Sequence, residues 1–354
     1  MGLERRALIK KSAPFLLVGA SIFIVYLYFF VDIPEMLATI QSIDMRYYSL
    51  AVLAIFVDTA FYALTWHYFL LPLSVRTPFR KTFLFVWVGA FVDILVPAES
   101  VSGDISKAYL MSEETGISAG KVVASIVSHR ILASAVTLGS LAIGSLSFLF
   151  LRHEIPDFVL NLVLIVSFGT SVTLVFLILL CFKQRMTRRL TDAVLKLVAF
   201  ISRGRWQLAT LRSEARRGLR AFHDAIGVLG RQPRSLAPPV VFSILSWLFS
   251  LLISLFVFLS LGYPISLSVV VTVYSISCAV QAIPAGIPAE VGVVEPIMIS
   301  LYALLGVPIS IGGAATILTR MLTVWLRFAI GFAATQWIGV KTLIGASSKG
   351  PKMR

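Results

Sequence analysis

Long apolar stretches alternate along the chain with short segments that are polar and mostly basic. Six stretches are long enough to cross a membrane as helices, because about 20 apolar residues span a hydrocarbon core of about 30 Å. They cover residues 13–31, 48–71, 122–151, 158–182, 240–261 and 309–340. The first is longer than a signal-peptide core and has no small-residue cleavage pattern before Asp32, so we predict that it is retained. The pattern predicts an all-α polytopic membrane protein with about six spanning helices.

Two further apolar stretches are too short to span comfortably. Residues 82–96 run up to Pro97, and residues 266–283 run up to Pro284. Glycines and charged residues follow each proline, and a continuous lipid-facing helix does not tolerate that combination. A second short segment then returns, at residues 103–111 in one case and 291–305 in the other. We therefore predict two re-entrant broken hairpins in addition to the spanning helices.

The two broken segments look like copies of one another. Four pairs of positions correspond, of which the last three share an offset of 190 residues: Pro97 with Pro284, Gly116 with Gly306, Ala124 with Ala314 and Arg130 with Arg320. The charges of the loops open the two hairpins to opposite faces of the membrane, which predicts an inverted internal repeat. Such a duplication is typical of transporter sites formed by discontinuous helices, whereas two unrelated glycine- and proline-rich loops are the alternative. We divide the chain into a first membrane repeat (1–182), a basic connector (183–235) and a second membrane repeat (236–354).

The composition supports the membrane class and fixes an orientation. Hydrophobic residues make up 58% of the chain and charged residues 14%, with a mean hydropathy of +0.91, which nearly excludes a soluble protein. The net charge of +14 could suggest a nucleic-acid partner, but nearly all 31 Lys and Arg residues lie in short segments on one predicted side. That bias predicts a cell-membrane protein with both termini in the cytoplasm and no nucleic-acid partner.

The connector has its own pattern. Residues 183–235 hold thirteen Lys or Arg residues against three acidic ones. Within them, apolar residues recur at spacings of three and four, as on one face of a helix: Leu208, Leu211, Ala215, Leu219, Phe222, Ile226 and Leu229. We expect a cytoplasmic amphipathic helix that lies on anionic headgroups. A docking helix for a partner protein is the alternative.

Arginines inside the predicted spans are the main candidates for chemistry. Thr316, Arg320, Thr323 and Arg327 lie along one face of the last helix, and Arg130 starts a similar face. An arginine at the centre of a membrane helix costs about 2.5 to 3.5 kcal/mol on insertion scales unless it faces protein or water. These faces should therefore point inward, although for Arg327, nearer the cytoplasmic end, snorkelling is a sufficient explanation.

Two roles are open for Arg130 and Arg320. The planar guanidinium group binds phosphate in a bidentate manner, so both could contact a lipid phosphate or another anionic headgroup at the hairpin tips. Alternatively they pair with hairpin carboxylates, Asp104 in the first half and Glu295 in the second, and stabilise the fold. Both roles can hold if the substrate competes for the pairs.

Other residues could complete a polar chamber. Gly286, Pro288 and Gly292 permit non-helical backbone, and the amino termini of half-helices there would favour an anionic guest. Asp58, near the middle of the 48–71 helix, either lines the same chamber or has a structural role. Asp93 and Gln281 precede the two prolines and could cap or line the turns.

Several classes of protein are not indicated. The chain contains no GxxxxGK[ST] loop, no GxSxG, HExxH or CxxC motif and no glycine fingerprint for nucleotides. Its four histidines show no metal-ligand spacing, and we predict no metal site, no cofactor and no catalytic residue. Transport of a substrate would then be downhill, or coupled to an ion or to the membrane potential.

The two repeats resemble the flippase-like transmembrane family that includes the membrane portion of lysylphosphatidylglycerol synthases. The first motif that carries the resemblance consists of Pro97, Gly103, Asp104, Lys107 and Arg130, and the second of Pro284, Gly286, Gly292, Glu295, Gly306, Val307 and Arg320. The resemblance covers nearly the whole chain, whereas the aminoacyl-transferring domain of the synthases is absent. It implies translocation of a lipid or lipid-linked headgroup, with Lys107 among the binding residues.

These observations lead to one principal hypothesis and two alternatives. The first is a protein that flips an anionic lipid headgroup through a central cavity formed by Arg130, Arg320, Asp104, Glu295, Lys107, Asp58, Thr316 and Thr323, with backbone turns at Pro97, Gly103, Pro284, Gly286 and Gly292. The second is a membrane-embedded enzyme that modifies a lipid phosphate, for which Asp104, Glu295 and His129 are the plausible proton carriers. The third is a membrane partner of a separately encoded lipid-modifying enzyme, bound through residues 183–235.

Overall fold

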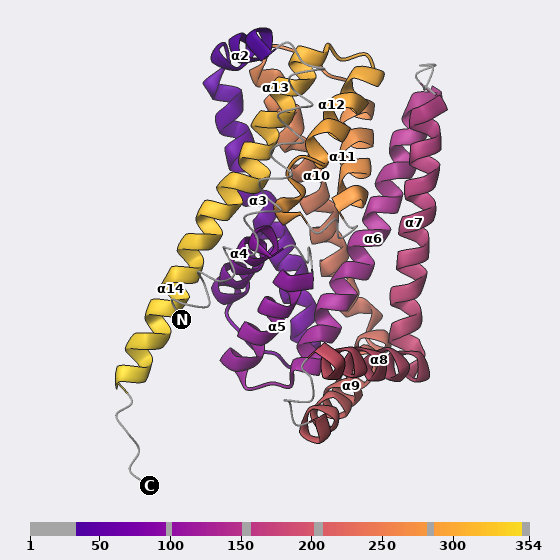
Figure 1. The fold of residues 1–354 in the computed structure, drawn as a ribbon, viewed down its shortest axis with the longest axis vertical. Helices are drawn as coiled ribbons and strands as arrows, with labels where there is room; N and C mark the ends of the chain where they lie inside the picture. The colour runs from indigo at the N-terminus through magenta and orange to yellow at the C-terminus, as the bar shows by residue number, and fades with distance from the viewer. Residues whose placement is uncertain (1–32, 97–100, 151–156, 202–207, 282–286, 349–354) are drawn as a thin grey trace.

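The structure is a bundle of helices (Figure 1). This computed structural model describes residues 33–96, 101–150, 157–201, 208–281 and 287–348, and all regular secondary structure within these ranges is helical. Five of the described helical segments are long and apolar enough to cross a membrane: Met45–Leu73, Ala119–Leu146, Asp157–Phe182, Pro233–Ser260 and Ile309–Ile338. The predicted all-α polytopic fold is confirmed, while the predicted first span at residues 13–31 lies outside the described residues.

The elements follow the order expected from the sequence. The first half contains α2 (Ile33–Gln41), α3 (Met45–Leu70), η1 (Leu71–Leu73), α4 (Phe79–Leu95), α5 (Val101–Thr115), α6 (Ala119–Phe150) and α7 (Asp157–Phe182). The connector forms α8 (Gln184–Ile201), α9 (Leu208–Arg231) and η2 (Pro233–Leu236). The second half contains α10 (Ala237–Ser260), α11 (Leu267–Gln281), η3 (Pro288–Glu290), α12 (Val294–Leu304), α13 (Ile309–Arg320), a π-helical segment η4 (Met321–Leu326) and α14 (Arg327–Ser348).

Two pairs of short helices form the predicted hairpins. Helices α4 and α5 pack on each other, as do α11 and α12, and each is shorter than a full span. Figure 1 shows α4 and α5 in the half of the molecule that ends at α8 and α9, and α11 and α12 in the half that ends at α2. We call these the α8–α9 end and the α2 end. The hairpins therefore enter from opposite ends, as an inverted repeat requires.

The turns that follow the two hairpins are equivalent. Gly116, between α5 and α6, has a φ of 67°, and Gly306, between α12 and α13, has a φ of 86°. Residues with side chains rarely adopt this left-handed conformation, whereas glycine adopts it freely. The offset of 190 residues in the sequence thus marks the same turn in each repeat.

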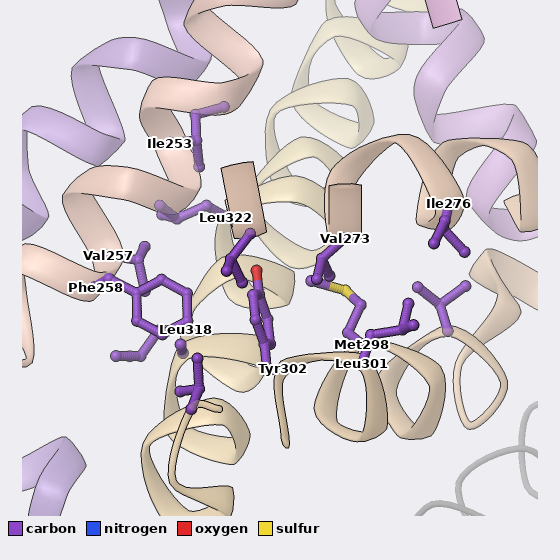
Figure 2. Close-up of a cluster of buried hydrophobic side chains, with 14 of the residues drawn as sticks. Ile253, Val257, Phe258, Val273, Ile276, Met298, Leu301, Tyr302, Leu318 and Leu322 are labelled. Carbon is purple, nitrogen blue, oxygen red and sulfur yellow. The ribbon is translucent and has the colours of Figure 1, made fainter. Parts of the chain in front are cut away.

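Most of the buried apolar side chains in the described residues belong to two clusters. One gathers residues of α10, α11, α12, α13 and η4, and in Figure 2 the ring of Tyr302 lies beside that of Phe258, with centroids 4.9 Å apart. The other lies toward the α8–α9 end and includes Trp66 and Met111, both fully buried. Packing of this kind holds the short hairpin helices, because they are too short to be held by lipid alone.

The connector corrects one prediction. The amphipathic helix is present as α9, but α8 was not predicted as a separate helix. The apolar side chains of Phe222, Ala225 and Leu229 are buried in the second cluster, so this face packs on protein, while contact of the basic residues with headgroups stays a prediction. A Cβ atom on Gly120 of α6 would come within 2.0 Å of the Gly218 carbonyl oxygen, so α9 crosses α6 in direct backbone contact. The period of an amphipathic helix shows that one face is covered but not what covers it.

Candidate functional site

A cavity of about 320 Å³ lies where the two hairpins meet the helices around them. Its lining comes from both repeats and includes five charged side chains, Asp58, Asp93, Lys107, Arg320 and Arg327. Thr323 and the predicted turn residue Gln281 also line it. Charged groups at this position in an apolar bundle mark a functional site by default, because their desolvation is costly.

The first hairpin is closed by Asp93 of α4. Its Oδ1 atom accepts hydrogen bonds from the Gly103 backbone N–H at 2.6 Å and from the Ser102 hydroxyl at 2.9 Å, so it caps the start of α5. A Cβ atom on Gly103 would lie 2.2 Å from Oδ2 of Asp93 and 2.5 Å from the Gly89 carbonyl oxygen. Gly103 is therefore a position where α4 and α5 are in close contact. It lies inside α5, so its predicted role as a backbone turn is wrong, and the absence of a side chain there serves helix packing instead.

Asp104 carries the charge pairs of the first hairpin. One of its oxygens lies 2.7 Å from Nζ of Lys107, and the other accepts a hydrogen bond from Nε of Arg130. Lys107 is 5% exposed and its Nζ lies 5.5 Å from the ring centroids of both Tyr62 and Trp66. The aromatic faces and Asp104 together stabilise a lysine that faces the cavity.

Glu295 has the corresponding place in the second hairpin. Its Oε2 accepts a hydrogen bond from the Gly292 N–H at 2.7 Å, and its Oε1 accepts one from Nε of Arg320 at 2.5 Å. Arg320 also donates through Nη2 to the Ala289 carbonyl oxygen at 2.5 Å. The backbone that receives it is unusual: Ala289, Glu290 and Gly292 have φ values of 54°, 51° and 87°. Left-handed non-glycine residues cost about 1 to 3 kcal/mol each, and the bonds to Arg320 and Glu295 offset that cost.

Arg327 corrects a second prediction. It does not snorkel toward a membrane surface, because its Nη2 donates to Oδ2 of Asp58 at 2.7 Å and the residue lines the cavity. Asp58 also accepts hydrogen bonds from the hydroxyls of Ser246 and Ser250, at 2.6 and 3.0 Å. The π-helical segment η4 lies between Arg320 and Arg327, and π segments inside membrane helices commonly occur at functional sites.

Comparisons with known proteins identify the family of the chain. The family model described as the lysylphosphatidylglycerol synthase TM region matches residues 16–331. The chain belongs to this family. It is similar to a UPF0104 membrane protein of Methanothermobacter thermautotrophicus, with 25% identity over 301 residues that cover 85% of this chain and 88% of the relative. A UPF0104 membrane protein of Pyrococcus horikoshii is 23% identical over 329 residues, 91% of this chain and 95% of the relative.

In this member of the synthase TM-region family, the predicted binding residues fall into two groups. Asp58, Lys107, Arg320 and Thr323 line the cavity. Asp104, Arg130, Glu295 and Thr316 do not appear in its lining: the first three form the ion pairs behind the wall, and Thr316 is fully buried. Pro97, Pro284 and Gly286 lie outside the described residues. The pairing of both arginines with hairpin carboxylates is thus present, and a direct role in substrate binding stays a prediction.

Arg327 was recognised from its spacing on the helical face of Arg320, but its place in the cavity was not predicted. Glu290 was not recognised from the sequence. Glu290 is 1% exposed and lies in the irregular η3 segment, where no periodic pattern marks it. His129 is also buried, with its ring 4.4 Å from that of Tyr62. Within the described part of the chain, no three His, Cys, Asp or Glu side chains are grouped to hold a metal ion.

Proposed function

We propose that this protein binds the headgroup of an anionic lipid and moves it across the bilayer through the central cavity. The observation that carries this proposal is the position of Lys107, Arg320 and Arg327, which line one cavity to which both hairpins contribute, and these hairpins enter from opposite ends. A site near the middle of the bundle, built from discontinuous helices of two inverted repeats, is the usual arrangement in transporters that work by alternating access.

The charges of the cavity wall favour a phosphate guest. Three cationic side chains line it, together with the carboxylates of Asp58 and Asp93. Each cation is held by an internal carboxylate, since Asp104 pairs with Lys107, Glu295 with Arg320 and Asp58 with Arg327. A headgroup phosphate would compete with these carboxylates for the same donors, so binding and release exchange one ion pair for another.

The basic connector indicates how the protein is oriented in the membrane. We propose that the α8–α9 end faces the cytoplasm of the cell, with both chain termini on that side, because residues 183–235 hold thirteen of the 31 Lys and Arg residues. The chain has no ATP-binding motif, so the headgroup would move down its gradient or with an ion or the membrane potential.

Transport fits the cavity better than the enzymatic alternative does. The proton carriers that such an enzyme would use are Asp104, Glu295 and His129, and none of them appears in the cavity lining. Asp104 and Glu295 each bind an arginine, which holds them as acceptors rather than free acids or bases. We therefore propose a transporter, with no chemical change to the lipid.

A flipping assay in reconstituted vesicles tests this proposal. Vesicles of phosphatidylcholine and phosphatidylglycerol would carry fluorescent phosphatidylglycerol, and the fraction bleached by an impermeant reductant would report its movement between leaflets. We expect Lys107→Gln to slow flipping by about tenfold or more, because one charge-assisted hydrogen bond contributes roughly 1.5 to 3 kcal/mol. Lys81→Gln is the matched control, since Lys81 forms an exposed ion pair with Glu114 away from the cavity. Equal rates for all three proteins, each correctly folded, would refute the proposal.

A further inference from the structure

A second polar hollow lies between α8 and α9, away from the central cavity. It has a volume of about 510 Å³ and its charged lining consists of Arg188, Arg216, Arg220, Asp192 and Asp224. We call it the α8–α9 groove. Figure 1 shows both helices lying across the end of the bundle, below the long helices α6 and α7. Its volume falls within the range of binding sites for small molecules and headgroups, about 300 to 1,000 Å³.

The groove arises from matching faces of two amphipathic helices. On α8, Arg188, Asp192 and Leu195 line it at spacings of four and three. On α9, Arg216 and Arg220 line it at a spacing of four. Residues at these spacings project from the same side of a helix, so each helix contributes one continuous row of side chains. The apolar face of α9 is held against α6, which fixes the row that α9 presents.

The three arginines of the groove differ from those of the central cavity. Arg320 and Arg327 are each paired with a carboxylate. Among the described residues, no such ion pair involves Arg188, Arg216 or Arg220. The three arginines outnumber the two carboxylates of the groove, Asp192 and Asp224, and an anion bound between them would offset the excess of positive charge. Guanidinium groups with free donors are suited to bidentate contact with phosphate oxygens.

His223 gives a second, independent indication of a ligand. Its Nδ1–H donates to the carbonyl oxygen of Cys181 at 3.1 Å. Its Nε2 atom is buried and has no hydrogen-bond partner in the described part of the protein. Buried polar atoms are normally satisfied, and His223 lines the groove. Because Nδ1–H is the donor, Nε2 of the neutral ring is an acceptor, so a hydroxyl or amine donor of a bound headgroup, next to its phosphate, would supply the missing partner.

The position of the groove at the end of a membrane span favours a lipid over a soluble compound as its ligand. Cys181 is the penultimate residue of α7, a helix long and apolar enough to span the membrane, so His223 sits at the level where the span ends. Lipid phosphates lie just outside the hydrocarbon core, at that same level. We propose that the α8–α9 groove binds the phosphate of a membrane lipid headgroup as a site separate from the central cavity. The bound lipid would hold α8 against α9.

Two triple variants with the same change in charge test this site. Arg188→Gln, Arg216→Gln and Arg220→Gln remove the cations that line the groove. Arg185→Gln, Arg189→Gln and Arg217→Gln remove exposed cations of the same two helices that do not line it, and form the matched control. Binding of dioctanoyl phosphatidic acid and of inorganic phosphate to the detergent-solubilised full-length protein would be measured by native mass spectrometry. Thermal unfolding would confirm that both variants are folded.

The site predicts a clear separation between the variants. Loss of the groove arginines should weaken phosphatidic acid binding about tenfold or more. The control triple should change it less than about threefold, because exposed cations that do not contact the headgroup act on it only through solvent, where salt screens charges within about 10 Å. The same loss should appear in a Lys107→Gln background, which separates the groove from the central cavity. Equal losses of phosphatidic acid affinity in both triple variants would show that the lipid responds to the overall surface charge, and would overturn the groove as a specific site. Inorganic phosphate binding as tightly as the lipid would overturn the assignment to a membrane lipid.

Discussion

The two hairpins share one plan but differ in how tightly their ion pairs are enclosed. In the second hairpin, the side chains of Arg320 and Glu295 are 8% and 5% exposed, and Glu295 both caps the Gly292 N–H and binds the arginine. In the first hairpin, the side chain of Arg130 is 37% exposed and that of Asp104 is 16% exposed. The cap there is a separate residue, Asp93.

This difference assigns different roles to the two halves. In the second hairpin, Arg320 and Glu295 are both buried, so removal of either side chain leaves the other as a buried charge without a partner of opposite charge. In the first hairpin, Asp104 is shared between Arg130 and Lys107, and Lys107 reaches the cavity. A pair that is partly accessible and shared can exchange partners at lower cost than an enclosed one. We therefore place the competition between carboxylate and lipid phosphate mainly in the first hairpin.

The largest effect on stability should come from Arg320→Met. It removes the bonds to Glu295 and to the Ala289 carbonyl and leaves Glu295 as an uncompensated buried charge, so we expect a loss of about 3 to 5 kcal/mol. Thermal unfolding in detergent and the yield of monodisperse protein would measure it. Adding Glu295→Gln, which still accepts the Gly292 N–H, should recover part of the loss. No recovery in the double variant would show that the ion pair is not the source of the effect.

Gly103→Ala should have the next largest effect, because its new Cβ would meet Asp93 and the Gly89 carbonyl at 2.2 and 2.5 Å. Overpacking of this kind costs about 1 to 3 kcal/mol, and here it would separate α4 from α5. The expected result is a lowered melting temperature together with slower flipping. Gly139→Ala is the control, since no atom lies within 4 Å of its Cβ position. A melting temperature as high as that of the control would contradict the close contact.

The paired turn glycines should respond equally in the two repeats. Gly116→Ala and Gly306→Ala each place a side chain on a left-handed residue with no neighbour within 4 Å of the new Cβ. The cost is therefore conformational only, about 1 to 2 kcal/mol at each site. Thermal unfolding of both variants provides the measurement. Clearly unequal losses would argue that the two turns are not equivalent and would weaken the inverted repeat.

Arg130→Gln should have the smallest effect on stability. A pair with this exposure contributes about 0 to 1 kcal/mol, well below the value expected for Arg320. The loss in flipping rate, expressed as a free energy, should nevertheless exceed the loss in the free energy of unfolding, because Asp104 would then bind Lys107 without competition from Arg130. Parallel flipping and unfolding measurements would separate the two quantities. A loss of stability as large as that of Arg320→Met would remove the contrast between the hairpins.

The parts of the architecture that depend on residues neighbouring in the sequence could be predicted from the sequence. Pro97, Gly116 and Gly306 interrupt apolar periodicity in the sequence itself, so the hairpins and turns were accessible without coordinates. The pairing of Arg320 with Glu295 was one of two roles that the cost of an unpaired buried charge left open. The pairing of Arg327 with Asp58 was not predicted, because it depends on the π-helical segment and on the packing of α3 against α10. The burial of Phe222 against α6 depends on tertiary contacts that an amphipathic period does not encode.

The most direct test is an electron cryomicroscopy map of the protein in nanodiscs that contain phosphatidylglycerol. The account predicts density for a lipid phosphate in the central cavity, with an oxygen about 3 Å from Nζ of Lys107. It also predicts that this density disappears in Lys107→Gln while the Arg320–Glu295 pair persists. A cavity without headgroup density, together with α4–α5 and α11–α12 entering from the same end, would contradict the account.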